Sequence, residues 1–255
     1  MGNSPSLFMT FPNFKNKHLA DALFHPTDYV NYKKLDKSQF PKKYLLIYQS
    51  TPYRHILRKF KGKYKKITFY SELSIIKIGK IGVIRMGGIG APYSSTIIEE
   101  LIALGGRKFI NIGTAGGLRH EGIFLCNKAI RDEGTSYHYI PHEKYSYPDK
   151  ILTKKLGNLI KKNKLEFSIA PTWTIDAPYR ETKKEVAHYK KEGVATVEME
   201  ASALFAVASV RKVKIAAAFV VSDVLGEKWD PKFHKMNVKK ALNKLVNIGI
   251  ECLSS

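Results

Sequence analysis

The chain has few cysteines and no long apolar segment. Its 255 residues include only Cys126 and Cys252, which lie far apart and have no neighbours at metal-ligand spacing. This pattern excludes a disulfide framework and a cysteine-based zinc site. No apolar run reaches the roughly 18 to 20 residues of a membrane-spanning helix, and the first residues do not resemble a signal peptide. We therefore expect a cytoplasmic protein with no metal ion and no membrane partner.

Acidic residues are also scarce. The chain has 22 aspartates and glutamates against 43 lysines and arginines, which gives a formal net charge of +21. Such a charge would suit nucleic acid, but the lysines lie in small groups along the whole chain, without a zinc-finger, basic-zipper or aromatic-basic strand pattern. We interpret the lysines as solvent-exposed surface that attracts a small anionic substrate, and we expect no nucleic-acid partner.

The sequence divides into an N-terminal arm and one larger domain. Residues 1–42 contain four prolines and little periodicity, which indicates an arm that lies on the body or reaches a neighbouring subunit. Residues 43–255 alternate short apolar runs with segments of helical periodicity, which predicts a single α/β domain with a mixed, mainly parallel central sheet flanked by helices. The expected strands are residues 44–48, 67–70, 73–78, 81–84, 108–112, 196–198 and 215–221, and the expected helices are residues 94–104, 151–162, 181–192, 201–210 and 237–253.

Two glycine-rich turns directly follow predicted strands, which is where ligands bind in open α/β sheets. The first turn contains Gly88 and Gly90 and leads to serines that can begin a helix. The second contains Gly113 and Thr114, so a hydroxyl group lies inside the turn. Glycines allow close backbone approach, and helix N-terminal amides bind anions. Both turns are compatible with an anion site, and a capped tight turn or a β-bulge would give the same pattern.

Three acidic residues follow two other apolar segments. Glu198 and Glu200 point to the same side of an extended stretch, and a carboxylate can accept hydrogen bonds from both hydroxyls of a sugar diol. Asp223 emerges from a very apolar strand, where its carboxyl group could act as an acid. Helix caps or ion-pair partners would also occur at such positions, so both interpretations stay open.

Together these segments resemble the family of nucleoside phosphorylases and nucleosidases, which includes bacterial purine nucleoside phosphorylase, uridine phosphorylase and methylthioadenosine nucleosidase. The resemblance spans residues 44–253. Its strongest motif is Val197-Glu198-Met199-Glu200-Ala201, followed at the right distance by Ser222-Asp223. The other motifs are Gly88-Ile89-Gly90 with Pro92, Gly113-Thr114-Ala115-Gly116-Gly117, and Asp132-Glu133-Gly134-Thr135-Ser136 with His138 and Pro141.

The resemblance implies a site that needs no cofactor and uses inorganic phosphate as co-substrate. Glu200 would hold the 2′ and 3′ hydroxyls of ribose beside Met199 and Glu198, and Asp223 would protonate or hydrogen-bond N7 of a purine. A nearby anion would stabilise the oxocarbenium-like sugar as the base departs. The implied catalytic residues are Asp223 and Glu200, the phosphate-binding residues are Gly88, Gly113, Thr114, Arg54 and Arg85, and the base-binding residues are Trp173, Tyr179, Arg180, Ser222 and Asp223.

The sequence departs from the family at positions that decide the reaction and the base. Asn111 stands where the phosphorylases place an arginine, and the hydrolytic nucleosidases also lack that arginine. Arg54 is in register with another phosphorylase arginine, and Arg85 could supply the missing charge. No glutamate lies between residues 44 and 66, where nucleosidases carry glutamates that activate water. Ser222-Asp223 resembles a purine site, whereas residues 133–138 and the first glycine turn are closer to uridine phosphorylase.

We therefore expect a nucleoside phosphorylase that cleaves a ribonucleoside to the free base and ribose 1-phosphate, with purines favoured over uridine. A hydrolytic nucleosidase and a non-catalytic nucleoside-binding sensor are the alternatives. The family assembles as dimers or trimers of dimers, so the resemblance also implies a homo-oligomer. His18 and His25 are candidates to reach the 5′ hydroxyl in a neighbouring subunit.

Overall fold

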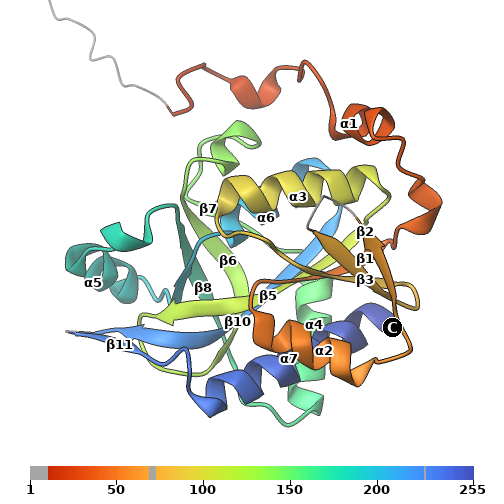
Figure 1. The fold of residues 1–255 in the computed structure, drawn as a ribbon. Coiled ribbons are helices and arrows are strands. Elements are labelled where there is room, and N and C mark those ends of the chain that lie inside the picture. The colour runs from red at the N-terminus through yellow and green to blue at the C-terminus, as the bar shows by residue number, and fades with distance from the viewer. Residues whose placement is uncertain (1–10, 69–72, 227) are drawn as a thin grey trace, which may run out of the picture.

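The fold is a mixed sheet with helices on both faces (Figure 1). A computed structural model describes residues 11–68, 73–226 and 228–255. The predicted α/β class, with a central sheet flanked by helices, is confirmed. The expected strand at residues 67–70 is described only as far as Thr68, because positions 69 and 70 lie outside the described residues.

The strands at the centre of the sheet run parallel, and antiparallel strands extend its edges. The central strands are β4 (Ile81–Arg85), β1 (Lys43–Ile47), β5 (Lys108–Gly117) and β10 (Lys214–Leu225). The antiparallel strands at the edges are β3 (Ser74–Ile78), β2 (Lys65–Thr68), β7 (Tyr145–Ser146) and β11 (Trp229–Pro231). Because β1 and β5 run parallel, the segments that follow them start from the same edge of the sheet.

Part of the sheet closes on itself. From β5 the pairing passes through β10 to β6 (Ile123–Asp132), then to β8 (Ser168–Ile175) and β9 (Thr196–Glu198), and β9 returns to pair with β5. We call these five strands the closed ring. Strand β5 therefore pairs with both β10 and β9, the two ends of this path. It also contains the residues that were predicted as the second glycine turn.

Two glycines of β5 make the closure possible. A Cβ atom at Gly116 would lie 2.9 Å from Cγ1 of Val197, and one at Gly117 would lie 2.8 Å from Cγ1 of Val221. Both distances are shorter than carbon atoms tolerate, so a side chain at either position would push β9 or β10 away. The glycine pair thus serves the strand packing of the ring.

Helices cover the sheet in two layers with separate apolar cores (Figure 1). The first layer contains α3 (Ala91–Ala103) and α6 (Ala201–Val210), and the second contains α2 (Ser50–Lys59), α4 (Lys150–Lys162) and α7 (Met236–Ser254). Helix α6 is buried from its first residue to Ala208, which explains why it is apolar on all sides. Each large apolar side chain buried in these cores contributes about 2 kcal/mol.

The N-terminal arm lies across the outside of α3. Its helix α1 (Pro26–Tyr32) packs on α3 and is anchored by the buried side chain of Val30, while Leu23 and Phe24 remain exposed. Among residues 11–68, 73–226 and 228–255, no helix combines the length and apolarity that crossing a lipid bilayer requires. The remaining helical elements are α5 (Lys183–Lys191) and the 3₁₀ turns Lys17–Leu19, Lys37–Gln39, Ser136–His138 and Pro178–Arg180.

Candidate active site

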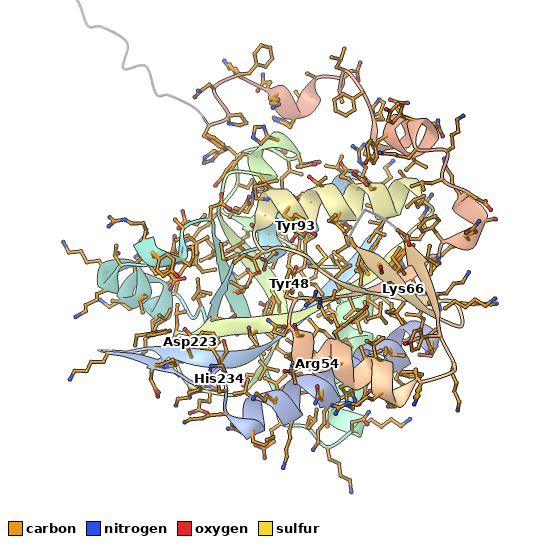
Figure 2. The ribbon with its side chains drawn as sticks, in the orientation of Figure 1. Tyr48, Arg54, Lys66, Tyr93, Asp223 and His234 are labelled. Atoms are coloured by element: carbon orange, nitrogen blue, oxygen red, sulfur yellow. The ribbon has the colours of Figure 1, made fainter. Side chains whose placement is uncertain are left out.

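A cavity of about 310 Å³ opens where β1, β5, β9 and β10 end. It is formed by segments that are distant in the sequence but adjacent in the sheet, as expected for a parallel α/β architecture. In Figure 2, Tyr48 lies near the middle of the molecule, and Asp223, which also lines the cavity, lies lower and to the left on β10. The predicted site residues that line the cavity are Gly113, Thr114, Glu198, Met199, Glu200, Ser222 and Asp223.

Glu200 lies in the wall where the two predicted glycine turns approach the end of β9. Its Oε1 atom accepts a hydrogen bond of 2.6 Å from the backbone amide of Gly90. Gly90 has a φ of +98°, a conformation that side chains rarely adopt, so the first turn needs glycine here to direct its amide at the carboxylate. Burial raises the pKa of Glu200, and the backbone hydrogen bonds from Gly90 and Met199 oppose that rise.

Glu198 is occupied by the protein itself. Its Oε2 accepts hydrogen bonds from the backbone amides of Glu200 and Ala201 at 2.8 and 2.7 Å, and its Oε1 accepts one from the hydroxyl of Thr174 at 2.6 Å. Burial raises the pKa of Glu198, with the neighbouring carboxyl of Glu200 adding to the rise and these three donors opposing it. Because both oxygens hold the start of α6, the geometry favours a supporting position over the direct ribose contact that we expected.

Asp223 also lines the cavity and is held by two donors. The hydroxyl of Ser222 donates to Oδ1 at 2.9 Å, and the indole nitrogen of Trp229 donates to Oδ2 at 2.9 Å. Trp229 was not predicted as a site residue. It reaches Asp223 because β11 folds back along β10, with Leu225 opposite Trp229.

The segment predicted to stack on the base is only partly at the cavity. Pro178 and Glu181 line it, but Tyr179 and Arg180 between them are exposed and do not. Within the 3₁₀ turn Pro178–Arg180, the side chains of Tyr179 and Arg180 face outward, so they do not line the cavity. Glu181 was missed from the sequence because no motif marks it.

The expected role of Trp173 in base stacking is wrong. Its side chain is fully buried, its indole nitrogen donates to Oδ2 of Asp132 at 2.8 Å, and its ring packs on Tyr189 with centroids 4.7 Å apart. Alternation along β8 directs this side chain into the core between β8 and α5 and away from the cavity. Trp173 therefore stabilises the fold and does not contact a base in the cavity.

The segment predicted as the second glycine turn is instead part of strand β5, and its Thr114 contacts the residue before α2. The hydroxyl of Thr114 accepts a hydrogen bond of 2.9 Å from the side-chain amide of Gln49, which is the residue before α2. Within the part of the chain that the structure describes, no side chain caps this helix end, so its first amides are available to an anion. Gln49 was not predicted from the sequence, because its position becomes informative only once the β1–β5 register is known.

The other predicted phosphate-binding residues, Arg54, Arg85 and Gly88, do not line the cavity. Arg85 donates from Nη1 to the hydroxyl of Ser50 at 2.9 Å, which places its charge beside the first turn of α2. Arg54 is exposed on α2, and Figure 2 shows it on that helix below Tyr48. Gly88 packs against the ring of Tyr93 and does not line the cavity, whereas Ile89 does.

Asn111 in β5 and Tyr48, which directly follows β1, both carry buried polar groups. Asn111 is fully buried, and within the described residues neither atom of its amide has a hydrogen-bond partner. The hydroxyl of Tyr48 is also buried, and desolvation together with the nearby charge of Glu200 raises its pKa well above the usual value. Asn111 is neutral, so its side chain does not supply the charge that the family resemblance implies at this position.

The two histidines proposed for the 5′ hydroxyl both lie on the arm. His25 is exposed and precedes α1, and His18 lies in the 3₁₀ turn before it. Neither lines the cavity of its own chain. Their expected contact with a neighbouring subunit stays a prediction.

The sequence and the fold are both similar to known proteins. The chain is 32% identical over 150 residues to a uridine phosphorylase of Treponema pallidum, a match that covers 52% of this chain and 58% of that relative. It is 28% identical over 173 residues to a guanosine phosphorylase of Halorubrum lacusprofundi, covering 63% and 72%. The crystal structure of an AMP nucleosidase from Bacteroides thetaiotaomicron superimposes with a TM-score of 0.74 at 20% identity, covering 91% of this chain and 97% of that one.

These similarities agree on the family and differ on the base and the reaction. The names of the relatives include a pyrimidine phosphorylase, a purine phosphorylase and a nucleosidase. The sequence model of the Phosphorylase superfamily matches residues 43–254, which is nearly the whole of the domain that follows the arm. The chain therefore belongs to the Phosphorylase superfamily of nucleoside phosphorylases and nucleosidases.

Proposed function

We propose that this chain cleaves the N-glycosidic bond of a purine ribonucleoside and transfers the ribose to inorganic phosphate. The observation that carries the proposal is that one cavity is lined by Glu200, by Asp223 and by Thr114 of β5. The reaction requires a group that accepts hydrogen bonds from the ribose diol, a group that contacts the base, and a place that binds the phosphate anion.

In the proposed reaction, Glu200 orients the sugar. The Gly90 amide holds Oε1, and the carboxylate accepts hydrogen bonds from the 2′ and 3′ hydroxyls. Its charge also stabilises the positive charge that develops on the ribose as the bond from C1′ to the base breaks. A phosphate oxygen then bonds to C1′, and Asp223 contacts the purine ring that receives the electron pair of the broken bond.

Phosphate as the second substrate is supported by the surroundings of Thr114 in β5. The hydroxyl of Thr114 accepts a hydrogen bond from Gln49, the residue before α2, and the N-terminus of a helix can bind an anion. Arg85 is hydrogen-bonded to Ser50 at the same helix end. The net charge of +21 would raise the local concentration of any small anion. The purine base is supported by Ser222 and Asp223 in the cavity, since the family's purine enzymes use an acid at this place.

The test is base release from purified protein, measured by chromatography with and without inorganic phosphate. Inosine, guanosine, adenosine, methylthioadenosine and uridine should be compared. We expect release from a purine nucleoside that depends on phosphate and gives ribose 1-phosphate in equal amount. Release from uridine alone would contradict the purine assignment, and no release from any of the five nucleosides would favour a non-catalytic sensor.

Hydrolysis is the second candidate function, and Asn111 is the observation that favours it. A buried neutral amide stands where the phosphorylases have an arginine, and Arg54 and Arg85 do not line the cavity. The same assay separates the two reactions, because a nucleosidase releases base at the same rate without phosphate and produces free ribose.

A further inference from the structure

A groove of about 330 Å³ lies between α4 and the beginnings of β6 and β8. We call it the α4 groove. It shares no lining residue with the candidate active site. Strand β8 connects the two places, because Ile169 near its start lines the groove and Pro178, beyond its end, lines the active-site cavity. A concave site of this volume is within the range of small-molecule sites, roughly 300 to 1,000 Å³.

One wall of the α4 groove is a basic face of α4. The residues of this face that line the groove include Lys150, Thr153, Lys154, Gly157 and Lys161. Their spacing of three and four residues places them on one side of the helix. Lys150 and Lys161 mark the two ends of this wall, roughly 16 Å apart along the helix axis. The groove therefore has a positive charge at each end.

The facing wall is apolar. A Cβ atom at Gly157 would lie 2.9 Å from Cδ2 of Leu125 and 3.6 Å from Cζ of Phe167, so these two side chains form the floor beneath the middle of α4. Tyr147 and Ile169 also line the groove and are 56% and 61% exposed. Covering such side chains releases water from apolar surface, so an apolar ligand group is favoured here.

The basic wall has no carboxylate to neutralise it. Among the described residues that line the groove, three are lysines and none is acidic, and within the same described residues these lysines form no ion pair. The neighbouring carboxylate of Asp149 caps α4 by accepting a backbone amide at 2.7 Å. The hydroxyl of Thr153 also has no hydrogen-bond partner in the described part of the chain. The groove is therefore suited to an anionic group beside an apolar one.

We propose that the α4 groove binds a straight-chain carboxylate of the fatty-acid type. The carboxylate lies between Lys150 and Lys154, and the hydrocarbon chain covers Leu125, Phe167 and Ile169. A purely polar anion such as phosphate would leave the apolar wall in water, and a concave groove suits one chain better than a flat lipid surface. The inference is independent of the proposed reaction, because the groove and the candidate active site share no residue.

The test is isothermal titration calorimetry of the full chain with decanoate and octanoate, each below the concentration at which it forms micelles. Decanoate should bind once per chain. Octanoate should bind about 15-fold more weakly, because two fewer CH₂ groups are buried. Decylammonium, which has the same tail and a positive head, should not bind. Equal affinities for the two carboxylates, or binding of decylammonium as tight as that of decanoate, would overturn the inference.

A charge reversal tests the basic wall. Lys150→Glu with Lys154→Glu should lower the affinity for decanoate about 10-fold or more, because both cations beside the carboxylate are replaced by anions. Lys240→Glu with Lys244→Glu is the matched control, since both lysines are exposed on α7 with the same spacing and the same change in net charge. The control should bind as the wild type does, and equal losses in the two double variants would reduce the effect to net charge and overturn the inference.

Ile169→Asp tests the apolar wall separately. The side chain already faces water, so the fold should persist, as circular dichroism would show, while decanoate binding is lost. Unchanged binding would overturn the inference. Sedimentation with phosphatidylserine vesicles by a wild type that does not bind free decanoate would also overturn it, in favour of a membrane surface. A wild type that releases no base from nucleosides would contradict the proposed function and leave these results unaffected.

Discussion

At the scale of single residues, the site depends on carboxylates that are held in different ways. Glu198 accepts three hydrogen bonds from the protein and Asp223 accepts two, whereas Glu200 accepts from the backbone of Gly90, through Oε1, and of Met199. Glu200 therefore keeps capacity for ligand hydroxyls, since an ionised carboxylate can accept about four. This capacity supports the proposed ribose contact of Glu200.

Glu200→Gln should therefore lose discrimination between ribose and deoxyribose. The amide keeps the size of the side chain but loses the charge and one acceptor, so kcat/KM for the ribonucleoside should fall roughly 30-fold. The matching 2′-deoxynucleoside should lose less, because it lacks one of the two hydroxyls. Both substrates are measured with the wild type, the variant and the control Glu166→Gln, at an exposed position outside the cavity, and equal losses on both substrates would contradict a diol contact.

The residues found from the sequence are those marked by motifs. Glu200, Thr114 and Asp223 each follow an apolar strand and could be placed in one site before the strand order was known. Gln49 and Trp229 could not, because each acts through a partner that only strand pairing brings near. The role of Trp173 was assigned wrongly because β8 was not predicted as a strand. Without that strand, the alternation that directs Trp173 into the core could not be inferred.

At the scale of elements, the start of α6 connects the site to the core. The helix has no side-chain cap at Glu200, its N-cap residue, and Glu198 supplies the acceptor instead for the amides of Glu200 and Ala201. The Thr174 hydroxyl bridges this group by accepting from the Ser202 amide at 3.0 Å. A negative charge is also favourable at a helix N-terminus, which offsets part of the cost of burying it.

Glu198→Ala should therefore destabilise the protein more than an exposed change does. It leaves buried amides and the Thr174 hydroxyl without acceptors and opens a cavity, so the free energy of unfolding should fall by about 3 kcal/mol. Urea denaturation followed by circular dichroism measures the change. Glu192→Ala, which removes an exposed ion pair with Lys144, should cost less than about 1 kcal/mol, and equal losses would contradict the supporting role of Glu198.

Strands β6 and β8 were not predicted from the sequence, because residues inside them interrupt the pattern of a strand. Strand β6 shifts register between Cys126 and Ala129, where Asn127 and Lys128 interrupt its apolar pattern. Strand β8 contains Pro171, which is unusual inside a sheet. Helix α2 is rich in polar residues and was not among the expected helices. Helix α3 begins at Ala91, earlier than expected, because Pro92 suits the first turn of a helix.

At the scale of the whole molecule, the arm exposes several large apolar side chains. The side chains of Leu23 and Phe24 are 100% and 71% exposed, and those of Phe14 and Leu19 are 69% and 75% exposed. Large apolar patches on a protein surface indicate contact sites. Together with the family resemblance, this favours an arm that is covered by a second copy of the chain.

Leu23→Asp with Phe24→Asp should therefore reduce the oligomeric mass measured by light scattering at the same protein concentration. Burying two carboxylates without partners in an interface costs several kcal/mol, so the assembly should dissociate on dilution. Ile151→Asp, at a 72% exposed position on α4, is the matched control and should leave the mass unchanged. A wild type that is already monomeric, or a double variant of unchanged mass, would contradict this assembly.

The closed ring has a consequence for how the chain is made on the ribosome. Strands β5 and β6 emerge early, but the strand that joins them, β10, is synthesised after all the other members of the ring. Until it arrives, both early strands present unpaired edges, which other nascent chains or chaperones can occupy. Because β10 also carries Asp223, the step that seals these edges also completes the lining of the candidate site.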